Sequence, residues 1–415
     1  MAGHQALSSP LQRISILDAL RGFALLGVIL IHMIQHFGMF SPPSGDGILH
    51  FEAADGAIRW FSYSIVMGKF INIFAFLFGM SFFIQMDRAE KKGIDFRIKF
   101  VWRMVLLFVM GVLSHSFFNI EIISVYAVFG LLLLLLNKMN NFVLLGVVAF
   151  LLLGGPRVIK AALHNSSLNT EVVEDTQQVE EQNREVVVPE HLANPSFINT
   201  AMYNYKERFA GKLNYQFGFI GRGFVTLALF ILGLVVGRVR FFERLQERSR
   251  LNGKLFIWFL AGLAGVTIFQ NILPPENTRM FFRTDGLHIT SSLLVAKMLE
   301  DIAMVLFTAV LVMGFILLYQ KIQFRKYLEI LAPYGRTALT NYMMQGVIGA
   351  ILFAPWALGF YFGEWGMTAL FILGILIYIL QIIFSKYWLN RYLYGPLEWL
   401  WRSGTYMKWQ PFRRK

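Results

Sequence analysis

Residues 16–37 read ILDALRGFALLGVILIHMIQHF, and this stretch decides the fold class. It is almost wholly apolar and long enough to cross a hydrocarbon core of about 30 Å as a helix. Runs of similar length recur throughout the 415 residues, which are 56% hydrophobic and include 41 phenylalanines. A soluble domain has too little interior to bury so much apolar surface. Because a helix satisfies its own backbone hydrogen bonds in lipid, the sequence predicts an all-α polytopic membrane protein.

The apolar runs predict about ten transmembrane helices. They lie at residues 16–37, 60–86, 100–117, 120–136, 142–158, 217–239, 255–273, 293–318, 339–360 and 367–383. Basic clusters stand in alternate connections and in the tail, at residues 87–99, 238–254, 321–326 and 386–415. The positive-inside rule puts all of them on the cytosolic side, with Arg13 and Arg21, only if there are ten spans. We therefore expect both termini in the cytosol.

A long hydrophilic connection divides the chain. We predict a first five-helix membrane half over residues 1–158, an extracytoplasmic loop over 159–216, and a second five-helix half with a basic cytosolic tail over 217–415. The loop is rich in glutamate, which is typical of a mobile or partly helical outer element. Five spans on each side would give the halves opposite orientations, as in inverted-repeat transporters, although the halves show no convincing self-similarity.

The amino-acid composition indicates which kinds of molecule the protein can bind. The net charge of +13 is spread over the loops rather than gathered into one stripe, so no nucleic-acid partner is expected. Basic and aromatic belts favour the lipid bilayer and anionic lipid headgroups as partners. The absence of cysteine excludes disulfides, thiolate zinc sites and thiol nucleophiles. No metal site is predicted, because no carboxylate accompanies His32 and His36 in the manner of the His-Glu-x-x-His pattern.

The first predicted span has arginines near its cytosolic end and a histidine, His32, deep in the membrane. From Leu17 to His32 a helix rises about 22 Å, so His32 lies toward the outer leaflet while Arg13 and Arg21 lie at the cytosolic surface. Guanidinium groups suit phosphate, and a neutral imidazole suits general-base work. An acyl-coenzyme A donor could place its phosphates on the arginines and extend its pantetheine arm toward His32. In the alternative, the arginines are positive-inside anchors, Asp18 pairs with Arg21, and His32 bonds a neighbouring helix.

The second span carries Lys69 and Asn72. Lys69 lies about 24 Å from the inner end of this span, close to the depth of His32. An unpaired ammonium there is costly, so we expect a carboxylate, water or an anionic ligand beside it. The alternative is that Lys69 snorkels to the outer interface. Asn72 is a second polar candidate one turn deeper.

Further polar side chains recur at a similar height in the predicted bundle. They are Ser114, His115, Glu121, Tyr126, Arg222, Lys297, Glu300 and Asp301. Taken singly, each is usually an interfacial group or an interhelical hydrogen bond. Together they predict a polar cavity open to the outside.

The cytosolic start of the ninth span is another candidate anion site. Residues 333–342 read PYGRTALTNY, so Asn341 lies in the first turns of that helix. Arg336 and the positive helix end could receive an anion there. The alternative is a capped helix start that anchors lipid headgroups.

These segments resemble the YeiB-like membrane protein family, known as domain of unknown function 418. The resemblance rests on LDALRGFALLG at 17–27, KF at 69–70, FLFG at 76–79, ISVYA at 123–127, GRTALTNY at 335–342 and GPLEWLWR at 395–402. More distantly, the chain resembles the transmembrane acyltransferases, including the acyltransferase 3 group and the lysosomal heparan glucosaminide N-acetyltransferase. Members of the acyltransferase 3 group have an arginine before the first span, matched here by Arg13. Their Asp-x-Leu-Arg element matches Asp18 and Arg21, and their helix histidine matches His32. The resemblance implies donor binding by the arginines and catalysis by His32.

We therefore predict a multi-pass acyltransferase of the cell membrane, which the resemblance suggests is a bacterial inner membrane. It would move an acyl group from cytosolic acyl-coenzyme A to a hydroxyl or amine of an extracytoplasmic acceptor, such as a sugar or envelope glycoconjugate. The expected catalytic residues are His32, Lys69, Asn72 and Glu121. The expected acceptor-binding residues are His36, His115, Tyr126 and Arg222. The expected donor-binding residues are Arg13, Asp18, Arg21, Arg336 and Asn341. The alternatives are a transporter or exporter of a small anionic or amphipathic solute, and a lipid-binding or assembly factor.

Overall fold

The structure is a computed structural model that describes residues 14–39, 48–168, 189–282 and 287–414. Within these ranges the assigned elements are helices, apart from an isolated bridge between Tyr392 and Arg413. The all-α prediction is therefore confirmed. Arg13, predicted to bind the donor, lies outside the described residues.

The helices are numbered in chain order. In the first part they are α1 (Ser15–Ile34), α2 (Glu52–Phe61), α3 (Lys69–Glu90), α4 (Arg97–His115), α5 (Ile123–Leu136), α6 (Asn141–Leu152) and α7 (Gly155–Leu168). Then come α8 (Glu190–Ala193), α9 (Phe197–Tyr203), α10 (Phe209–Phe217), α11 (Arg222–Arg238), α12 (Ser249–Ile272) and α13 (Ser291–Gln320). The last are α14 (Ile322–Leu328), α15 (Ala332–Arg336), α16 (Ala338–Phe353), α17 (Gly359–Phe362), α18 (Met367–Arg391) and α19 (Pro396–Tyr406).

In the part of the chain that the structure describes, six helical segments are long and apolar enough to cross a membrane, or eight if each of two bent pairs is one span. The six are α1, Glu52–Glu90, α4, α12, α13 and α18, and the bent pairs are α6 with α7 and Phe197–Phe217 with α11. The helices α5 and α16 are apolar but shorter. The chain is therefore polytopic, as predicted, while the count of ten spans and the sidedness of the termini stay predictions.

Two predicted boundaries were wrong because of backbone geometry. The span predicted at 142–158 breaks at Gly154, whose φ of +78° is the left-handed conformation that glycine adopts readily. The helices α6 and α7 consequently meet at a bend of 46°. The span predicted at 16–37 would place His32 and His36 one turn apart on one helix, but α1 ends at Ile34 and His36 has a φ of +48°. The two imidazoles therefore do not share a helical face.

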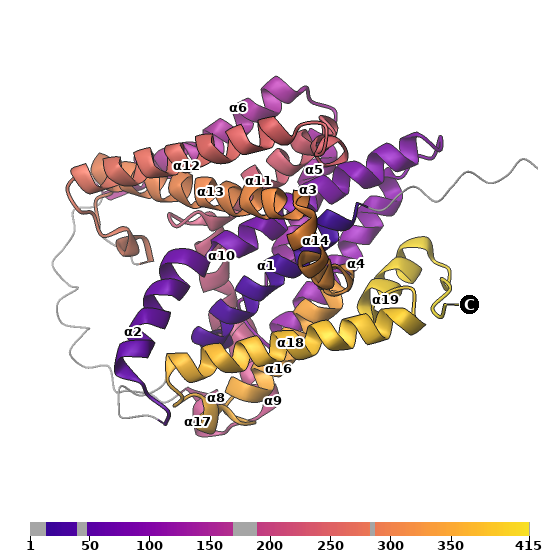
Figure 1. Cartoon of the computed structure of the whole chain (residues 1–415). Coiled ribbons are helices and arrows are strands. Elements are labelled where there is room, and N and C mark those ends of the chain that lie inside the picture. Colours follow the sequence, from indigo (N-terminus) through magenta and orange to yellow (C-terminus); the bar gives the residue numbers. More distant parts are fainter. Residues whose placement is uncertain (1–13, 40–47, 169–188, 283–286, 415) are drawn as a thin grey trace, which may run out of the picture.

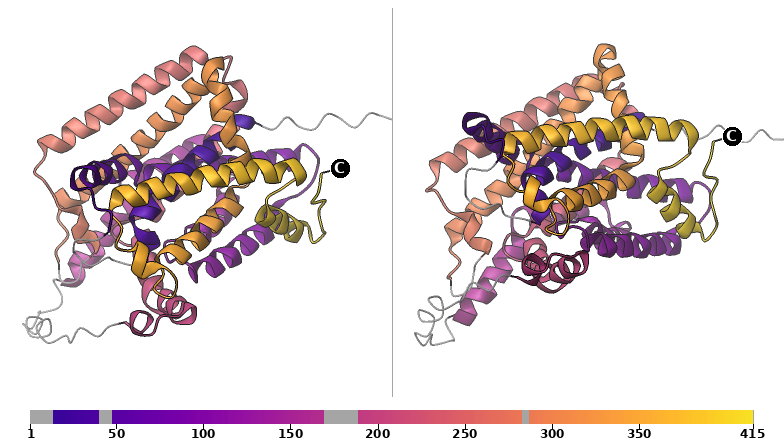
Figure 2. Two further views of the ribbon diagram at one scale, coloured as in Figure 1. Left: turned by 60° about the horizontal axis from the view of Figure 1, so that its bottom comes forward. Right: turned by 90° about the horizontal axis from the view of Figure 1, so that it is seen from below.

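The helix α1 forms the centre of the molecule, with α3, α13, α15, α16 and α18 packed around it (Figure 1). Two further views show α18 running alongside it (Figure 2). The packing against α15 is close: a Cβ added at Gly335 would lie 1.8 Å from the backbone oxygen of Asp18. This approach brings the start of α16 beside the charged part of α1.

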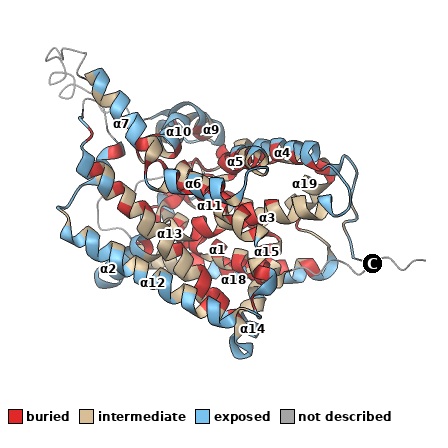
Figure 3. Ribbon diagram, turned by 90° about the horizontal axis from the view of Figure 1, so that it is seen from above, coloured by how far each residue is buried: buried red, intermediate tan, exposed pale blue. Residues whose placement is uncertain are grey.

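The outer face of α12 has the character expected of a lipid-facing helix. Among its residues only Asn252 is buried, and the helix is mostly exposed in Figure 3. Trp258 and Ile272 are both 73% exposed. Large apolar side chains exposed in this way favour contact with lipid tails.

The predicted outer loop is largely helical where it is described. Residues 159–168 belong to α7, and α8, α9 and α10 occupy most of residues 190–217. Residues 169–188 lie outside the described part of the chain.

Candidate functional site

A cavity of about 300 Å³ lies between the first and last parts of the chain, lined by α1, α3, α4, α5, α15, α16 and α19. Its wall is mostly apolar and includes Phe74, Phe78, Phe82, Phe100, Met104 and Leu107. From Ile71 to Gln85 it follows α3 for about 21 Å at 1.5 Å per residue. It is therefore a long apolar slot, of a size that suits a small-molecule ligand.

Three arginines, Arg21, Arg103 and Arg336, line one end of this slot. Arg21 forms an ion pair with Asp18, and its other terminal nitrogen donates to Ser81 Oγ at 2.7 Å. The pairing of Asp18 with Arg21, which belonged to the alternative interpretation of this segment, is therefore confirmed. The pairing holds Asp18, which is 3% exposed, behind the guanidinium rather than on the cavity surface.

Arg103 is a cavity residue that sequence reasoning missed. Its guanidinium stacks on the Trp401 ring at 3.6 Å from the ring centre, and the Trp401 indole donates to the Arg103 carbonyl at 2.8 Å. Its Nε is buried, and no described residue accepts a hydrogen bond from that atom. The sequence did offer one indication of it: Arg103 lies inside the predicted span 100–117, and a charged side chain within a membrane span usually belongs to a functional site.

The positive end of α16 is occupied by the protein's own carboxylate. Glu398 of α19 accepts hydrogen bonds from the Leu339 amide at 2.7 Å and from the Thr340 hydroxyl at 2.6 Å. Burial raises the pKa of Glu398, and the hydrogen bonds from Thr340 and Leu339 oppose that rise. The expectation that this helix end stands ready for an outside anion needs correction, since Glu398 already caps it.

Asn341 lies next to this cap but does not line the cavity. Its amide nitrogen donates to the Tyr334 carbonyl at 3.1 Å and to the hydroxyls of Thr337 and Ser385 at 2.8 and 3.0 Å. Asn341 is 1% exposed. In this arrangement it ties α16 to α15 and α18 and does not reach the slot.

The opposite end of the slot is lined by two tyrosines. The Tyr126 hydroxyl donates to the Ile71 carbonyl at 3.0 Å, and the Tyr342 hydroxyl accepts from the Ile122 amide at 3.2 Å. Of the residues predicted for the site, the cavity brings together Arg21, Arg336 and Tyr126.

His32 stands beyond this tyrosine end and does not line the slot. Its ring lies 5.3 Å from that of Phe37 and 6.5 Å from that of Phe118, and the Phe118 ring lies 5.8 Å from that of Tyr342. The Nδ1 atom of His32 is buried and has no hydrogen-bond partner among the described residues. Phe118 and Tyr342 therefore separate the imidazole from the cavity.

His36 packs elsewhere. Its ring lies 5.0 Å from that of Phe353, and burial lowers its pKa from 6.5 to about 4. This environment keeps the imidazole neutral at pH 7.

Glu121 and His115 belong to contacts between helices. Glu121 is 1% exposed, pairs with Lys212 and accepts from the Ser124 amide at 3.1 Å, so it caps α5. The His115 Nε2 and the Asn204 carbonyl are 3.0 Å apart. Both residues tie the hairpin of α4 and α5 to the helical segment before α11.

Lys69, Asn72 and Arg222 form another group at the start of α3. Arg222 donates to the Asn72 amide oxygen and to the Gly68 carbonyl, the latter at 2.9 Å. The Asn72 amide donates to the Thr308 hydroxyl at 3.2 Å. The predicted site residues thus fall into separate clusters, and only some of them reach the slot.

Two family profiles match different parts of the chain. The family described as "Heparan-alpha-glucosaminide N-acetyltransferase, catalytic" matches residues 13–179, and the family described as "Protein of unknown function (DUF418)" matches residues 236–408. The slot takes its walls from both regions: α1, α3, α4 and α5 from the first, and α15, α16 and α19 from the second.

Bacterial relatives match along nearly the whole chain. The "Uncharacterized protein YxaH" of Bacillus subtilis (strain 168) is 27% identical over 97% of each chain. The "Uncharacterized 39.9 kDa protein in amylase 3'region" of Bacillus acidopullulyticus is 29% identical, again over 97% of each. The "Uncharacterized protein YeiB" of Escherichia coli (strain K12) is 39% identical over 75 residues, 18% of this chain and 19% of that protein. No solved structure shows a significant match. The chain is thus similar to the YeiB- and YxaH-like proteins, with a region similar to DUF418 behind a region similar to an N-acetyltransferase catalytic domain.

Proposed function

We propose that this protein is a membrane-embedded acyltransferase that takes an acyl group from acyl-coenzyme A and passes it to a hydroxyl or amine of an acceptor on the other side of the membrane. The observation that carries the proposal is the slot itself, with arginines at one end and, past its tyrosine end, His32. The match of residues 13–179 to an acetyltransferase catalytic region supports it.

In this proposal the arginine end faces the cytosol and binds the donor's phosphates. Arg21, Arg103 and Arg336 present planar guanidinium groups, which form paired, charge-assisted hydrogen bonds with phosphate oxygens. The orientation follows the positive-inside rule applied to ten spans. The donor comes from the cytosol, and the protein lies in a bacterial inner membrane.

The length of the slot suits the donor's pantetheine arm. The arm would run about 21 Å along α3, between the ring walls, and bring the thioester to Tyr126 and Tyr342. Rotation of the Tyr342 and Phe118 side chains would then connect the thioester with His32. Without that rotation the two aromatic rings keep the imidazole and the slot apart.

His32 would act as the general base. Its imidazole takes the proton of the acceptor hydroxyl or amine as that oxygen or nitrogen forms a bond to the acyl carbon. The carbon–sulfur bond breaks, and the proton passes to the departing thiolate of coenzyme A. The acceptor is a sugar or an envelope glycoconjugate. Neither Lys69 nor Glu121 lines the slot, so we give both residues roles in binding and packing rather than in the reaction itself.

Donor binding tests this proposal directly. With detergent-purified protein, titration calorimetry should show binding of acetyl-coenzyme A or a longer acyl-coenzyme A. Replacing Arg103 or Arg21 with Ala should weaken binding about tenfold each, since each removes a charge-assisted contact. Arg325→Gln is a matched control, because Arg325 is an exposed arginine paired with Glu329 outside the slot.

Two results would overturn the proposal. One is the absence of binding by wild-type protein to any acyl-coenzyme A. The other is equal binding by the wild type and both slot variants. If, in addition, the reconstituted protein moved an anionic solute without consuming a thioester, a transporter would be the better account.

A further inference from the structure

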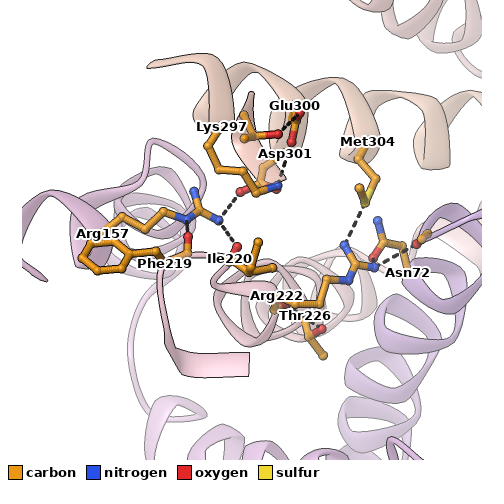
Figure 4. Close-up of polar contacts among 12 residues, drawn as sticks. Asn72, Arg157, Phe219, Ile220, Arg222, Thr226, Lys297, Glu300, Asp301 and Met304 are labelled. Carbon is orange, nitrogen blue, oxygen red and sulfur yellow. Dashed lines mark hydrogen bonds and ion pairs between the residues drawn. The ribbon is translucent and has the colours of Figure 1, made fainter. Parts of the chain in front are cut away.

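Two groups of cationic side chains lie side by side along α13 (Figure 4). Carboxylates balance the charge of the first group but not that of the second. In the first, Arg157 pairs with Asp301, and the Lys297 ammonium lies 3.0 Å from carboxylate oxygens of both Glu300 and Asp301. Two carboxylates thus meet two cations. Buried charges are tolerated when they are paired in this way.

The second group begins one turn farther along α13, where Arg222 points at Met304 instead of a carboxylate (Figure 4). Its nitrogens donate to the Met304 sulfur at 2.8 Å, the Gly68 carbonyl at 2.9 Å and the Asn72 amide oxygen. Arg222 is 7% exposed, and in the described ranges no Asp or Glu forms an ion pair with it. The neutral groups orient the guanidinium but leave its charge uncompensated.

Lys69 adds a second charge of the same sign. It follows Gly68, whose carbonyl accepts from Arg222, and its own ammonium donates to the Ser64 carbonyl at 2.8 Å. The ammonium also lies 5.6 Å from the centre of the Phe307 ring. No carboxylate pairs with it in the part of the chain that the structure describes. Two neighbouring uncompensated cations on apolar helices are costly unless an anion joins them.

The backbone adds to the positive potential. Lys69 is the first residue of α3 and Arg222 is the first residue of α11, and neither helix has a side-chain hydrogen bond at its N-cap. The two helices run parallel, because Gly68 lies against Arg222, Gly79 against Phe230 and Gly237 against Phe83. Their positive ends therefore lie together, which favours an anion at the same place as the two side chains.

We propose that Lys69 and Arg222 form a binding site for a phosphate group at the end of α3 opposite Arg21. Arg222 supplies an oriented guanidinium from the buried side, and Lys69, which is only partly buried, supplies an ammonium. The phosphate belongs either to a lipid headgroup or to a free phosphate compound. The site does not depend on the proposed acyl transfer, although a phosphorylated lipid-linked acceptor held here would lie near the tyrosine end of the slot.

Thermal unfolding of the detergent-purified protein tests the site. Inorganic phosphate should raise the Tm of the wild type above that in sodium chloride of equal ionic strength. Lys69→Gln and Arg222→Lys should each weaken the apparent phosphate affinity about tenfold. Lys297→Gln, which changes a lysine already paired with carboxylates on α13, should leave that affinity unchanged.

A second arm uses vesicles and distinguishes the two sources. If protein in phosphatidylglycerol is more stable than in phosphatidylcholine, and Lys69→Gln removes the difference, the ligand is a lipid headgroup. If inorganic phosphate stabilises the protein and phosphatidylglycerol does not, the ligand is a free phosphate compound. Lys69→Gln serves as the main variant, because its partly exposed side chain can be replaced without emptying a buried position. The proposal is overturned if neither phosphate nor phosphatidylglycerol stabilises the wild type, or if Lys69→Gln and Lys297→Gln respond as the wild type does.

Discussion

The carboxylate of Glu398 lies 2.7 Å from the backbone nitrogen of Leu339, so a residue of α19 caps the start of α16. The same carboxylate accepts from the Thr340 hydroxyl at 2.6 Å. The cap joins the carboxyl-terminal helix to the wall of the slot, because Leu339 and Glu398 both line it. The chain's tail is thereby part of the candidate site rather than a separate appendage.

Removing this cap should loosen α16 and α19 together. Glu398→Ala leaves the first amide groups of α16 without their acceptor and should lower the free energy of unfolding by about 1 kcal/mol. Glu398→Gln keeps an oxygen acceptor, so its free energy of unfolding should fall by less than that of Glu398→Ala. Tm measurements on the two variants check this order, and equal stability of Glu398→Ala and the wild type would show that the cap contributes nothing.

Acid should destabilise the protein through His36. Its pKa is about 4 in the folded state and near 6.5 when unfolded, so the unfolded chain binds more protons between these values. The contribution of neutral His36 to the stability of the folded protein is complete above pH 6.5 and is lost as the pH falls toward 4. His36→Gln should therefore flatten the dependence of Tm on pH between pH 7 and pH 5. An unchanged slope in this variant would contradict the burial of a neutral His36.

The ion pair of Arg157 and Asp301 should be costly to break. Both side chains are almost fully buried, at 2% and 3% exposure. Asp301→Asn leaves Arg157 and Lys297 with less compensation and should cost about 3–5 kcal/mol of stability. Glu300→Gln is the matched control on the same helix, since Glu300 is 42% exposed and should matter far less. Similar losses in Tm for the two variants would argue against a buried network.

Close packing of α1 on α15 predicts a large effect of one methyl group. Gly335→Ala would place a Cβ against the Asp18 backbone oxygen, and because backbone cannot swing aside, the helices must separate. We expect a loss of about 1–3 kcal/mol and weaker donor binding, since Arg21 and Arg336 shift with these helices. Gly253→Ala on α12 meets nothing within 4 Å and should be neutral or stabilising. Equal Tm values for the two variants would show that α1 and α15 are not in this contact.

Much of the fold was readable from the sequence because lipid imposes simple rules on it. The apolar runs, including the first one at 16–37, correspond to helices, and the pairing of Asp18 with Arg21 follows from their spacing on one helix. The bend at Gly154 was not predictable in the same way, since a glycine in an apolar run is also compatible with a straight helix.

The grouping of the site residues depended on tertiary contacts that hydropathy does not encode. Depth along a helix placed His32, Glu121 and Arg222 at similar heights, but the rotation of each helix decides which neighbour a side chain meets. Glu121 meets Lys212, which lies 91 residues away in the chain. Arg103 and Glu398 joined the site because α4, α16 and α19 converge, and neither lies in a motif with a known chemical role.

The most direct test is the release of free coenzyme A thiol from an acyl-coenzyme A, with water or an added sugar as the acyl acceptor, by purified wild type, His32→Ala and His36→Ala. The two histidines stand at the same end of α1, so the second variant controls for general damage there. We expect His32→Ala to bind the donor normally but to release thiol at least about 100-fold more slowly, while His36→Ala retains activity. Thiol release by folded His32→Ala at the wild-type rate would show that His32 is not the general base.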